Sequence, residues 1–218
     1  MGVLLLLFLT DMFELLQRMG SAVCHQMAER SFILEGMQMP FCARCTGIYT
    51  GAFFAFCFFF LKKRMGGAKP FSIPQAVLTG LAILLVGLDG VSSYLGLRES
   101  SQLLRIVTGS LVGSVSVGFL LMAGNYDPKQ ENSIPVYENT LELLVLMIVS
   151  VGFGLCLWAG FGIFGLSAVF SVIGEVLLWG GLVWLFLKKP MEKKKLPVWS
   201  ISLSVSFAVL FLIGGLIP

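Results

Sequence analysis

Long apolar segments separated by short polar ones dominate this chain. Five of them meet or approach the length of about 20 mostly apolar residues that a helix needs to cross a bilayer, and a sixth follows. No polar segment between them is long enough to form a soluble domain. The pattern predicts an all-α, polytopic membrane helix bundle in which residues 1–218 form a single integral membrane domain. The six segments cover residues 46–61, 74–96, 101–124, 140–163, 165–187 and 197–217.

The first 20 residues, MGVLLLLFLTDMFELLQRMG, contain an apolar run that Asp11 and Glu14 interrupt. No basic residue precedes this run and no small-residue cleavage site follows it, which argues against a secretory signal peptide. The segment is either a first transmembrane helix with one polar end or an amphipathic helix lying in the membrane interface. We therefore expect six or seven transmembrane helices.

The rest of the chain divides into three parts. A loop at 21–45 carries cysteine and histidine residues, core spans follow at 46–124, and three further spans occupy 140–217. Within the core, small residues recur every four positions, a spacing that lets membrane helices approach closely. These residues are Gly109 with Gly113, and Ser110 with Ser114 and Gly118.

Composition agrees with this pattern. Hydrophobic residues make up 57% of the chain and charged residues 12%, whereas ordinary soluble domains are roughly half apolar and one quarter charged. The net charge of +3 is too small to indicate a nucleic-acid partner. We expect membrane lipids as the surroundings of the protein, and the sequence leaves its oligomeric state open.

Basic residues gather in two clumps that predict the orientation in the membrane. They are KKRMGGAK at 62–69 and KKPMEKKK at 188–195. Such clumps favour the cytoplasmic side, and an even number of spans separates the two, so both lie on that side. The loop at 21–45 and the junction at 97–101 are then predicted to face the extracytoplasmic side of the cell membrane.

The loop holds the first of two polar clusters on this face. The segments CHQMAERSF and PFCARCTGIY contain three of the five cysteines and the only histidine. Their clustering, more than their number, marks a candidate site. The candidate ligands for a metal are Cys24, His25, Cys42 and Cys45.

The second cluster lies in GLDGVSSYLGLRESSQLLRIVTG. The spacing of Arg98, Gln102, Arg105 and Thr108 predicts that they lie on one face of a helix, with two guanidinium groups side by side. Charges at the apolar boundary cost free energy unless they are paired or hydrated, which makes them functional candidates. Pairing of Asp89 with Arg98 or Arg105 as an internal strut is an alternative that is compatible with a functional role. The candidate catalytic residues are Asp89, Arg98, Glu99 and Arg105.

These motifs together resemble a known family. CHQ, RSF, PFCARCTGIY, DG and RESSQLLRIVTG follow one another within residues 20–124, and this order is similar to that in the prokaryotic multi-pass membrane proteins grouped as domain of unknown function 2085. The resemblance implies a membrane location and the importance of these motifs. It implies no biochemical activity, and residues 140–218 lie outside it.

One interpretation of the first cluster is a metal site. A C-x-x-C spacing presents two thiolates to one tetrahedral ion, and a third ligand with water in the fourth position would make a catalytic zinc pattern. The side chains of adjacent residues diverge, so we expect Cys24 or His25 as the third ligand, and not necessarily both. Zinc is the predicted ion, with iron as the alternative; an iron–sulfur cluster usually needs four cysteines.

A second interpretation is thiol redox chemistry. Cys42 and Cys45 have the spacing of a dithiol–disulfide pair, cysteines meet an oxidising environment outside the cytoplasm, and Arg44 with a helix start near Thr46 favours a thiolate. This interpretation leaves His25 without a role. The simplest alternative is a structural disulfide or structural zinc that fixes the loop.

If the site is catalytic, the two clusters have complementary roles. A metal held by the first cluster lowers the pKa of a bound water, and Asp89 or Glu99 acts as the base. Arg98 and Arg105 bind an anionic group, because a guanidinium fork suits phosphate. This hypothesis describes a zinc-dependent hydrolase or transferase acting on an anionic, lipid-like substrate.

Glu175 is the one acid deep within the later spans. Proton relays in transporters use such residues, so a transporter is a third hypothesis, beside that of a non-catalytic membrane scaffold. A glutamate that contacts a neighbouring helix or its backbone is the structural alternative.

Overall fold

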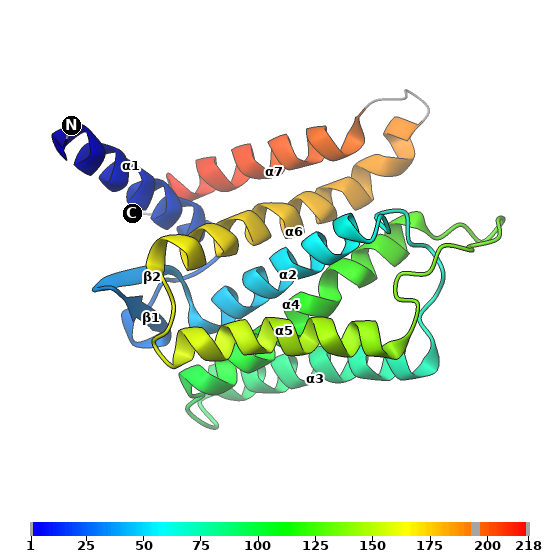
Figure 1. Cartoon of the computed structure of the whole chain (residues 1–218), viewed down its shortest axis with the longest axis horizontal. Helices are drawn as coiled ribbons and strands as arrows, with labels where there is room; N and C mark the ends of the chain where they lie inside the picture. Colours follow the sequence, from blue (N-terminus) through cyan, green and yellow to red (C-terminus); the bar gives the residue numbers. More distant parts are fainter. Residues whose placement is uncertain (1, 193–196, 217–218) are drawn as a thin grey trace.

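The computed structural model describes residues 2–192 and 197–216 of the chain (Figure 1). Positions 193–195 of the second basic clump and residue 217 of the last predicted span lie outside this part. The described part is an all-α bundle with one small β-hairpin. Its helices are α1 (Gly2–Ser21), α2 (Ala43–Leu61), α3 (Ile73–Tyr94), α4 (Gln102–Asn125), α5 (Thr140–Trp158), α6 (Phe164–Glu192) and α7 (Val198–Gly214).

The helices agree with the predicted spans. Five of them, α2 to α6, have the length and the apolar composition needed to cross a membrane, and α7 is a shorter apolar helix. The sequence therefore located each of these elements, with ends that differ from the predicted ones by up to five residues, as at the C-terminal ends of α5 and α6. Helix α1 exists as predicted, and whether it crosses the membrane stays a prediction.

Helix α2 lies centrally, between α4 on one side and α6 on the other, with α7 beyond α6 and α5 and α3 beyond α4 (Figure 1). Its contact with α4 is the most extensive in the bundle. Small residues permit this closeness: a Cβ atom on Gly109 would lie 2.3 Å from the carbonyl oxygen of Arg44, and one on Gly113 would lie 2.1 Å from that of Ile48. The four-residue spacing of small residues was therefore correctly predicted to be a packing surface.

From α2 to α7, successive helices run in opposite directions, so their connections alternate between the two ends of the bundle (Figure 1). One end carries the chain from 22 to 42 together with the connections 95–101 and 159–163, and the opposite end carries 62–72 and 126–139. Both polar clusters thus lie at one end, as predicted. At the opposite end, Arg64 forms ion pairs with Glu138 and Glu142.

The segment predicted to be a loop at 21–45 contains regular structure. After a short 3-10 helix at Ala28–Arg30, strands β1 (Ser31–Leu34) and β2 (Met37–Cys42) form an antiparallel hairpin. Glu35 and Gly36 both have positive φ, at 53° and 78°, as the tightest two-residue hairpin turns require. The Glu35 carboxylate also accepts a hydrogen bond of 3.1 Å from the backbone N–H of Phe164 at the start of α6, which fixes the hairpin against the bundle.

Candidate metal centre and the adjoining arginine cavity

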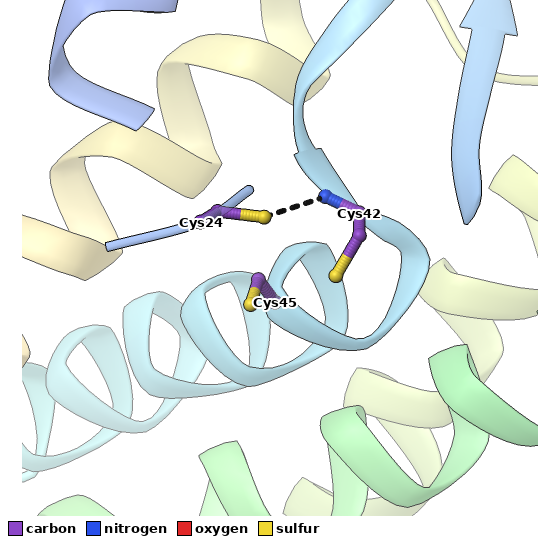
Figure 2. A group of neighbouring side chains, drawn as sticks. All are labelled: Cys24, Cys42 and Cys45. Carbon is purple, nitrogen blue, oxygen red and sulfur yellow. Dashed lines mark hydrogen bonds between the residues drawn. The ribbon is translucent and has the colours of Figure 1, made fainter. Parts of the chain in front are cut away.

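Three cysteines from different segments meet where α2 begins (Figure 2). Cys24 lies in the turn after α1, Cys42 ends β2 and is the N-cap of α2, and Cys45 lies in the first turn of α2. Their sulfur atoms all lie within 4.8 Å of one another. All three are free thiols. We call this group the thiol cluster.

Local hydrogen bonds hold Cys24 against the start of α2. The backbone N–H of Cys42 donates to the Cys24 sulfur at 3.2 Å (Figure 2). The Gln26 amide donates to the backbone oxygens of Gln17 and Pro40, each at 2.8 Å. Gln26 has a positive φ of 49°, and its side chain ties the turn to both α1 and β2. Gln26 of the CHQ motif therefore positions the neighbouring cysteine.

The environment of the thiol cluster favours one thiolate. Cys24 is buried and packs in an apolar core with Met19, Phe41 and Tyr49. Hydrogen bonds from the thiols of Cys24 and then Cys45 hold the pKa of Cys42 well below its ordinary value, and backbone N–H groups at the start of α2 act in the same direction. The pKa of Cys24 is raised, chiefly by its hydrogen bond with Cys42.

The thiol cluster fits a soft divalent metal ion. Zinc–sulfur bonds of about 2.3 Å in a tetrahedron place two sulfurs about 3.8 Å apart, which agrees with three sulfurs that lie within 4.8 Å of one another. The group supplies three ligand atoms and leaves a fourth position. His25, adjacent to Cys24, is exposed and does not belong to the group. This agrees with the expectation that the side chains of these two neighbours diverge.

Asp89 is the centre of an ion-pair network beside the thiol cluster. Its carboxylate is 1% exposed and accepts hydrogen bonds from the guanidinium of Arg44, from Nη2 of Arg98 at 2.7 Å and from Oγ of Ser100 at 2.6 Å. The predicted internal strut therefore exists, with Arg98 as one partner. The second partner is Arg44 of α2, where the sequence had offered Arg105.

The predicted helix face in the second cluster needs a correction. Helix α4 begins at Gln102, so Arg98 lies in the preceding connection and not on the same helical face as Arg105. Ser101 is the N-cap of α4 and accepts a hydrogen bond from the backbone N–H of Leu104. Because the helix begins only after this cap, helical spacing does not extend back to Arg98 and does not place the two arginines side by side. The two guanidiniums come together only through the fold of the connection.

Arg105 and Arg98 line one cavity of about 680 Å³. Its wall combines the 3-10 helix, the end of α3, the connection before α4 and the first turn of α4. The lining residues are Glu29, Arg30, Ser93, Gly96, Arg98, Glu99, Ser100 and Arg105. We call this space the arginine cavity.

The thiol cluster and the arginine cavity are neighbours. Arg44 lies between Cys42 and Cys45 in sequence and forms an ion pair with Asp89, which in turn binds Arg98. The Arg105 guanidinium also interacts electrostatically with the Cys42 thiol. The sequence had placed Arg44 in the cysteine motif, but no local signal revealed its pairing with Asp89, 45 residues away.

Comparison with known proteins agrees with the resemblance seen in the sequence. The model of the family described as predicted membrane protein (DUF2085) matches residues 24–120. An uncharacterized protein of Methanothermobacter thermautotrophicus is 36% identical over 91 residues, which are 42% of this chain and 78% of that relative. The chain belongs to this family.

A second relative extends the comparison. An uncharacterized protein of Methanocaldococcus jannaschii is 39% identical over 102 residues, which are 46% of this chain and 63% of that relative. The chain thus spans somewhat less than two thirds of this relative. No solved structure matches the chain. The region that the family model matches contains the thiol cluster and the arginine cavity, and α5 to α7 lie beyond it.

Glu175 of α6 is the remaining acid that the sequence singled out. It is fully buried, and neither of its carboxyl oxygens has a hydrogen-bond partner within the described part of the chain. The expected contact with a neighbouring helix backbone is therefore not a hydrogen bond. Tyr49 of α2 interacts electrostatically with both Glu175 and Cys45.

Proposed function

We propose that this protein is a metal-binding membrane protein that holds zinc with Cys24, Cys42 and Cys45. The observation that carries the proposal is the convergence of three free thiols from three segments on one point. The lowered pKa of Cys42 at the edge of an apolar core favours a thiophilic ion, because the thiolate is the form that binds metals. Iron is the alternative ion for the same three ligands.

We further propose that the metal centre serves an enzyme acting on an anionic, lipid-like substrate. Zinc with an open fourth position supplies an activated water. The arginine cavity beside it supplies cationic groups for the substrate. Among the predicted bases, Asp89 has both oxygens engaged by Arg44 and Arg98, whereas Glu99 is exposed and lines the cavity. Glu99 is therefore the better candidate base.

The site is proposed to face the extracytoplasmic side. All nine lysines lie in 62–69, at 129 and in 188–195. The described parts of these segments, which are 62–69, 129 and the end of α6 at 188–192, belong to the end of the bundle opposite the thiol cluster. By contrast, five of the six arginines lie elsewhere. A lysine-rich end favours the cytoplasm.

Elemental analysis of the detergent-purified chain tests the metal proposal. The chain is prepared without chelator, and zinc, iron and free thiols are counted for the wild type and for a Cys42→Ser, Cys45→Ser variant. We expect about one metal ion per chain in the wild type and none in the variant. Cys57→Ser is the matched control, because Cys57 also lies in α2 but outside the cluster.

A protein that folds with no metal, before and after incubation with zinc, would sink this proposal. Thiol–disulfide exchange is then the second candidate, favoured by the closeness of the same three free thiols. In that reaction a partner disulfide accepts two electrons and two protons and becomes a dithiol, while Cys42 and Cys45 form a disulfide. A reversible mass shift on alkylation after incubation in reducing and oxidising buffers identifies this alternative.

A further inference from the structure

Arg105 is a buried cation that lacks a carboxylate partner. The residue is 5% exposed, and within the described residues no carboxylate forms a salt bridge with it. Its Nε donates to the backbone oxygen of Ser100 and its Nη2 to Oγ of Ser93, each at 3.1 Å. A guanidinium has about five N–H donors, so about three remain for another acceptor.

The charges around Arg105 do not supply that acceptor. Asp89 is the one buried carboxylate of the cluster, and Arg44 and Arg98 already bind it. Glu29 and Glu99 lie on the cavity wall but are exposed, and Glu29 forms its salt bridge with Arg30. A buried charge without a partner destabilises the fold. An anion bound at Arg105 would offset this cost.

The surroundings of Arg105 are suited to a tetrahedral anion. Ser93, Arg30 and Arg98 line the same cavity, and so does Ser100, whose hydroxyl already donates to Asp89. The Ser93 hydroxyl and the guanidinium forks together can donate to several oxygens of one phosphate group. The volume of about 680 Å³ lies within the range of roughly 300–1,000 Å³ that small-molecule sites have. There is room for a phosphate together with the group that it esterifies.

We propose that Arg105 anchors the phosphate group of a phosphate ester in the arginine cavity. As a statement about the substrate, this inference rests on the proposed function, but the binding step requires no metal. Arg105 is the specificity-determining residue, and Arg30 and Arg98 at the cavity wall add charge from more exposed positions. The ester is either a phospholipid headgroup or a soluble phosphate ester that enters from the aqueous side.

Binding of phosphate esters to the purified full-length chain tests this inference. Three probes are used: inorganic phosphate, glycerol phosphate, and nanodiscs of phosphatidic acid diluted in phosphatidylcholine, with pure phosphatidylcholine as the reference. Affinity for the soluble probes is measured by calorimetry, and lipid retention by native mass spectrometry. Arg105→Gln removes the charge, Arg105→Lys keeps it without the fork, and Lys129→Gln changes an exposed cation at the opposite end.

We expect at least one probe to bind the wild type and Arg105→Gln to lose at least ten-fold in affinity. Arg105→Lys should retain part of the affinity, because the ammonium lacks the bidentate geometry, and Lys129→Gln should behave as the wild type. Preferential retention of phosphatidic acid identifies a lipid headgroup, and binding of glycerol phosphate with no lipid preference identifies a soluble ester.

Stability separates an anion site from a purely structural arginine. Without ligand, Arg105→Gln should unfold at the same temperature as the wild type or higher, since it removes an unpaired buried charge. Added ligand should raise the unfolding temperature of the wild type and leave that of the variant unchanged. Wild-type protein that binds none of the probes, or a folded Arg105→Gln variant of unaltered affinity, would overturn the inference.

The zinc content of the same samples keeps the two proposals apart. If Arg105→Gln loses phosphate binding and no sample contains metal, the metal proposal is refuted and the phosphate site stands. If the wild type contains its full zinc but binds none of the probes, the phosphate site is refuted and the metal proposal stands.

Discussion

The residues at the start of α2 face two different neighbours. Cys42 and Cys45 meet Cys24 from the turn after α1, while Arg44 binds Asp89 of α3. The Arg44 side chain, through its ion pair with Asp89, therefore connects the thiol cluster to the arginine cavity. Substitution of Cys42 or Cys45 tests the chemistry of the thiols, and substitution of Arg44 tests the electrostatics of the ion pairs.

The reactivity of the thiols should depend on pH in different ways. The pKa of Cys42 is lowered, so its thiolate is present above that lowered pKa and persists at about pH 6, where a thiol of ordinary pKa is protonated. The pKa of Cys24 is raised, so its thiolate is scarce until the medium is alkaline. Between about pH 6 and pH 8, alkylation of Cys42 in metal-free protein should change little.

Mass spectrometry of peptides after brief exposure to iodoacetamide measures these rates. The exposed Cys156 is followed in the same samples as a thiol outside the cluster. A rate at Cys42 that rises about ten-fold for each pH unit over this range, as at an unperturbed thiol, would contradict the assignment.

Loss of the Asp89 carboxylate should destabilise the fold. Asp89→Asn leaves the guanidiniums of Arg44 and Arg98 without their anion. Breaking a buried pair costs about 3–5 kcal/mol, and the exposure of Arg98 at 43% of its side chain reduces the expected cost to roughly 2 kcal/mol. The midpoint of thermal or urea unfolding in detergent measures it.

Glu29→Gln provides the control for Asp89→Asn. The Glu29–Arg30 pair is 3.9 Å long with both side chains largely exposed, and such pairs contribute little. If both variants unfolded at the wild-type midpoint, Asp89 would not be a strut.

At the scale of elements, the approach of α2 to α4 sets the geometry of the site. Gly109 and Gly113 of α4 lie against backbone atoms of Arg44 and Ile48. Arg105 lies about one turn of α4 before Gly109. The small residues therefore bring Arg105 close to the thiol cluster, although none of them takes part in its chemistry.

Adding a single methyl group at this contact should be costly. In Gly113→Ala the new Cβ would lie 2.1 Å from the carbonyl oxygen of Ile48, so the helices must separate. Overpacking of this kind costs about 1–3 kcal/mol, and we also expect weaker metal retention because α2 shifts. Gly80→Ala in α3, where nothing lies within 4 Å of the new Cβ, should be neutral or slightly stabilising.

Unfolding midpoints and metal content of the two variants check this prediction. Equal stability of both variants would show that the helices separate at no cost. The assigned role of the small residues would then be wrong.

The molecule as a whole is asymmetric between its two ends. One end combines the hairpin, the thiol cluster and the arginine cavity, and the other carries the lysine-bearing connections 62–72 and 126–139. Connections that are far apart in sequence form each end because the consecutive helices α2 to α7 are antiparallel (Figure 1). The proposed orientation is therefore a property of the whole bundle and can be tested at any exposed connection.

Leu97→Cys and Gln130→Cys place a reporter thiol at each end. Both positions are exposed. In intact cells, a membrane-impermeant maleimide should label Leu97→Cys and should reach Gln130→Cys only after permeabilisation. Labelling is compared with the unsubstituted chain, which carries the five native cysteines. The reverse pattern would place the thiol cluster in the reducing cytoplasm and would refute the proposed orientation.

The sequence by itself determined the architecture, because crossing a bilayer imposes a length and an apolar composition on each helix that are visible locally. The ends of α2 to α7 and the packing role of Gly109 and Gly113 follow from such local rules. The motifs around Cys24, Cys42 and Cys45 also marked the candidate metal ligands, since uncommon residues cluster there in an apolar chain.

Only the tertiary structure decided which of these residues meet. The tight turn at Glu35 and Gly36 makes a hairpin of a predicted loop, and the connection before α4 removes Arg98 from the face of Arg105. The pairing of Arg44 with Asp89 joins two helices through residues 45 positions apart, and side-chain partners at such separations depend on packing. The unpaired state of Arg105 likewise follows from where every neighbouring charge lies, a property that belongs to the folded molecule and that no local pattern encodes.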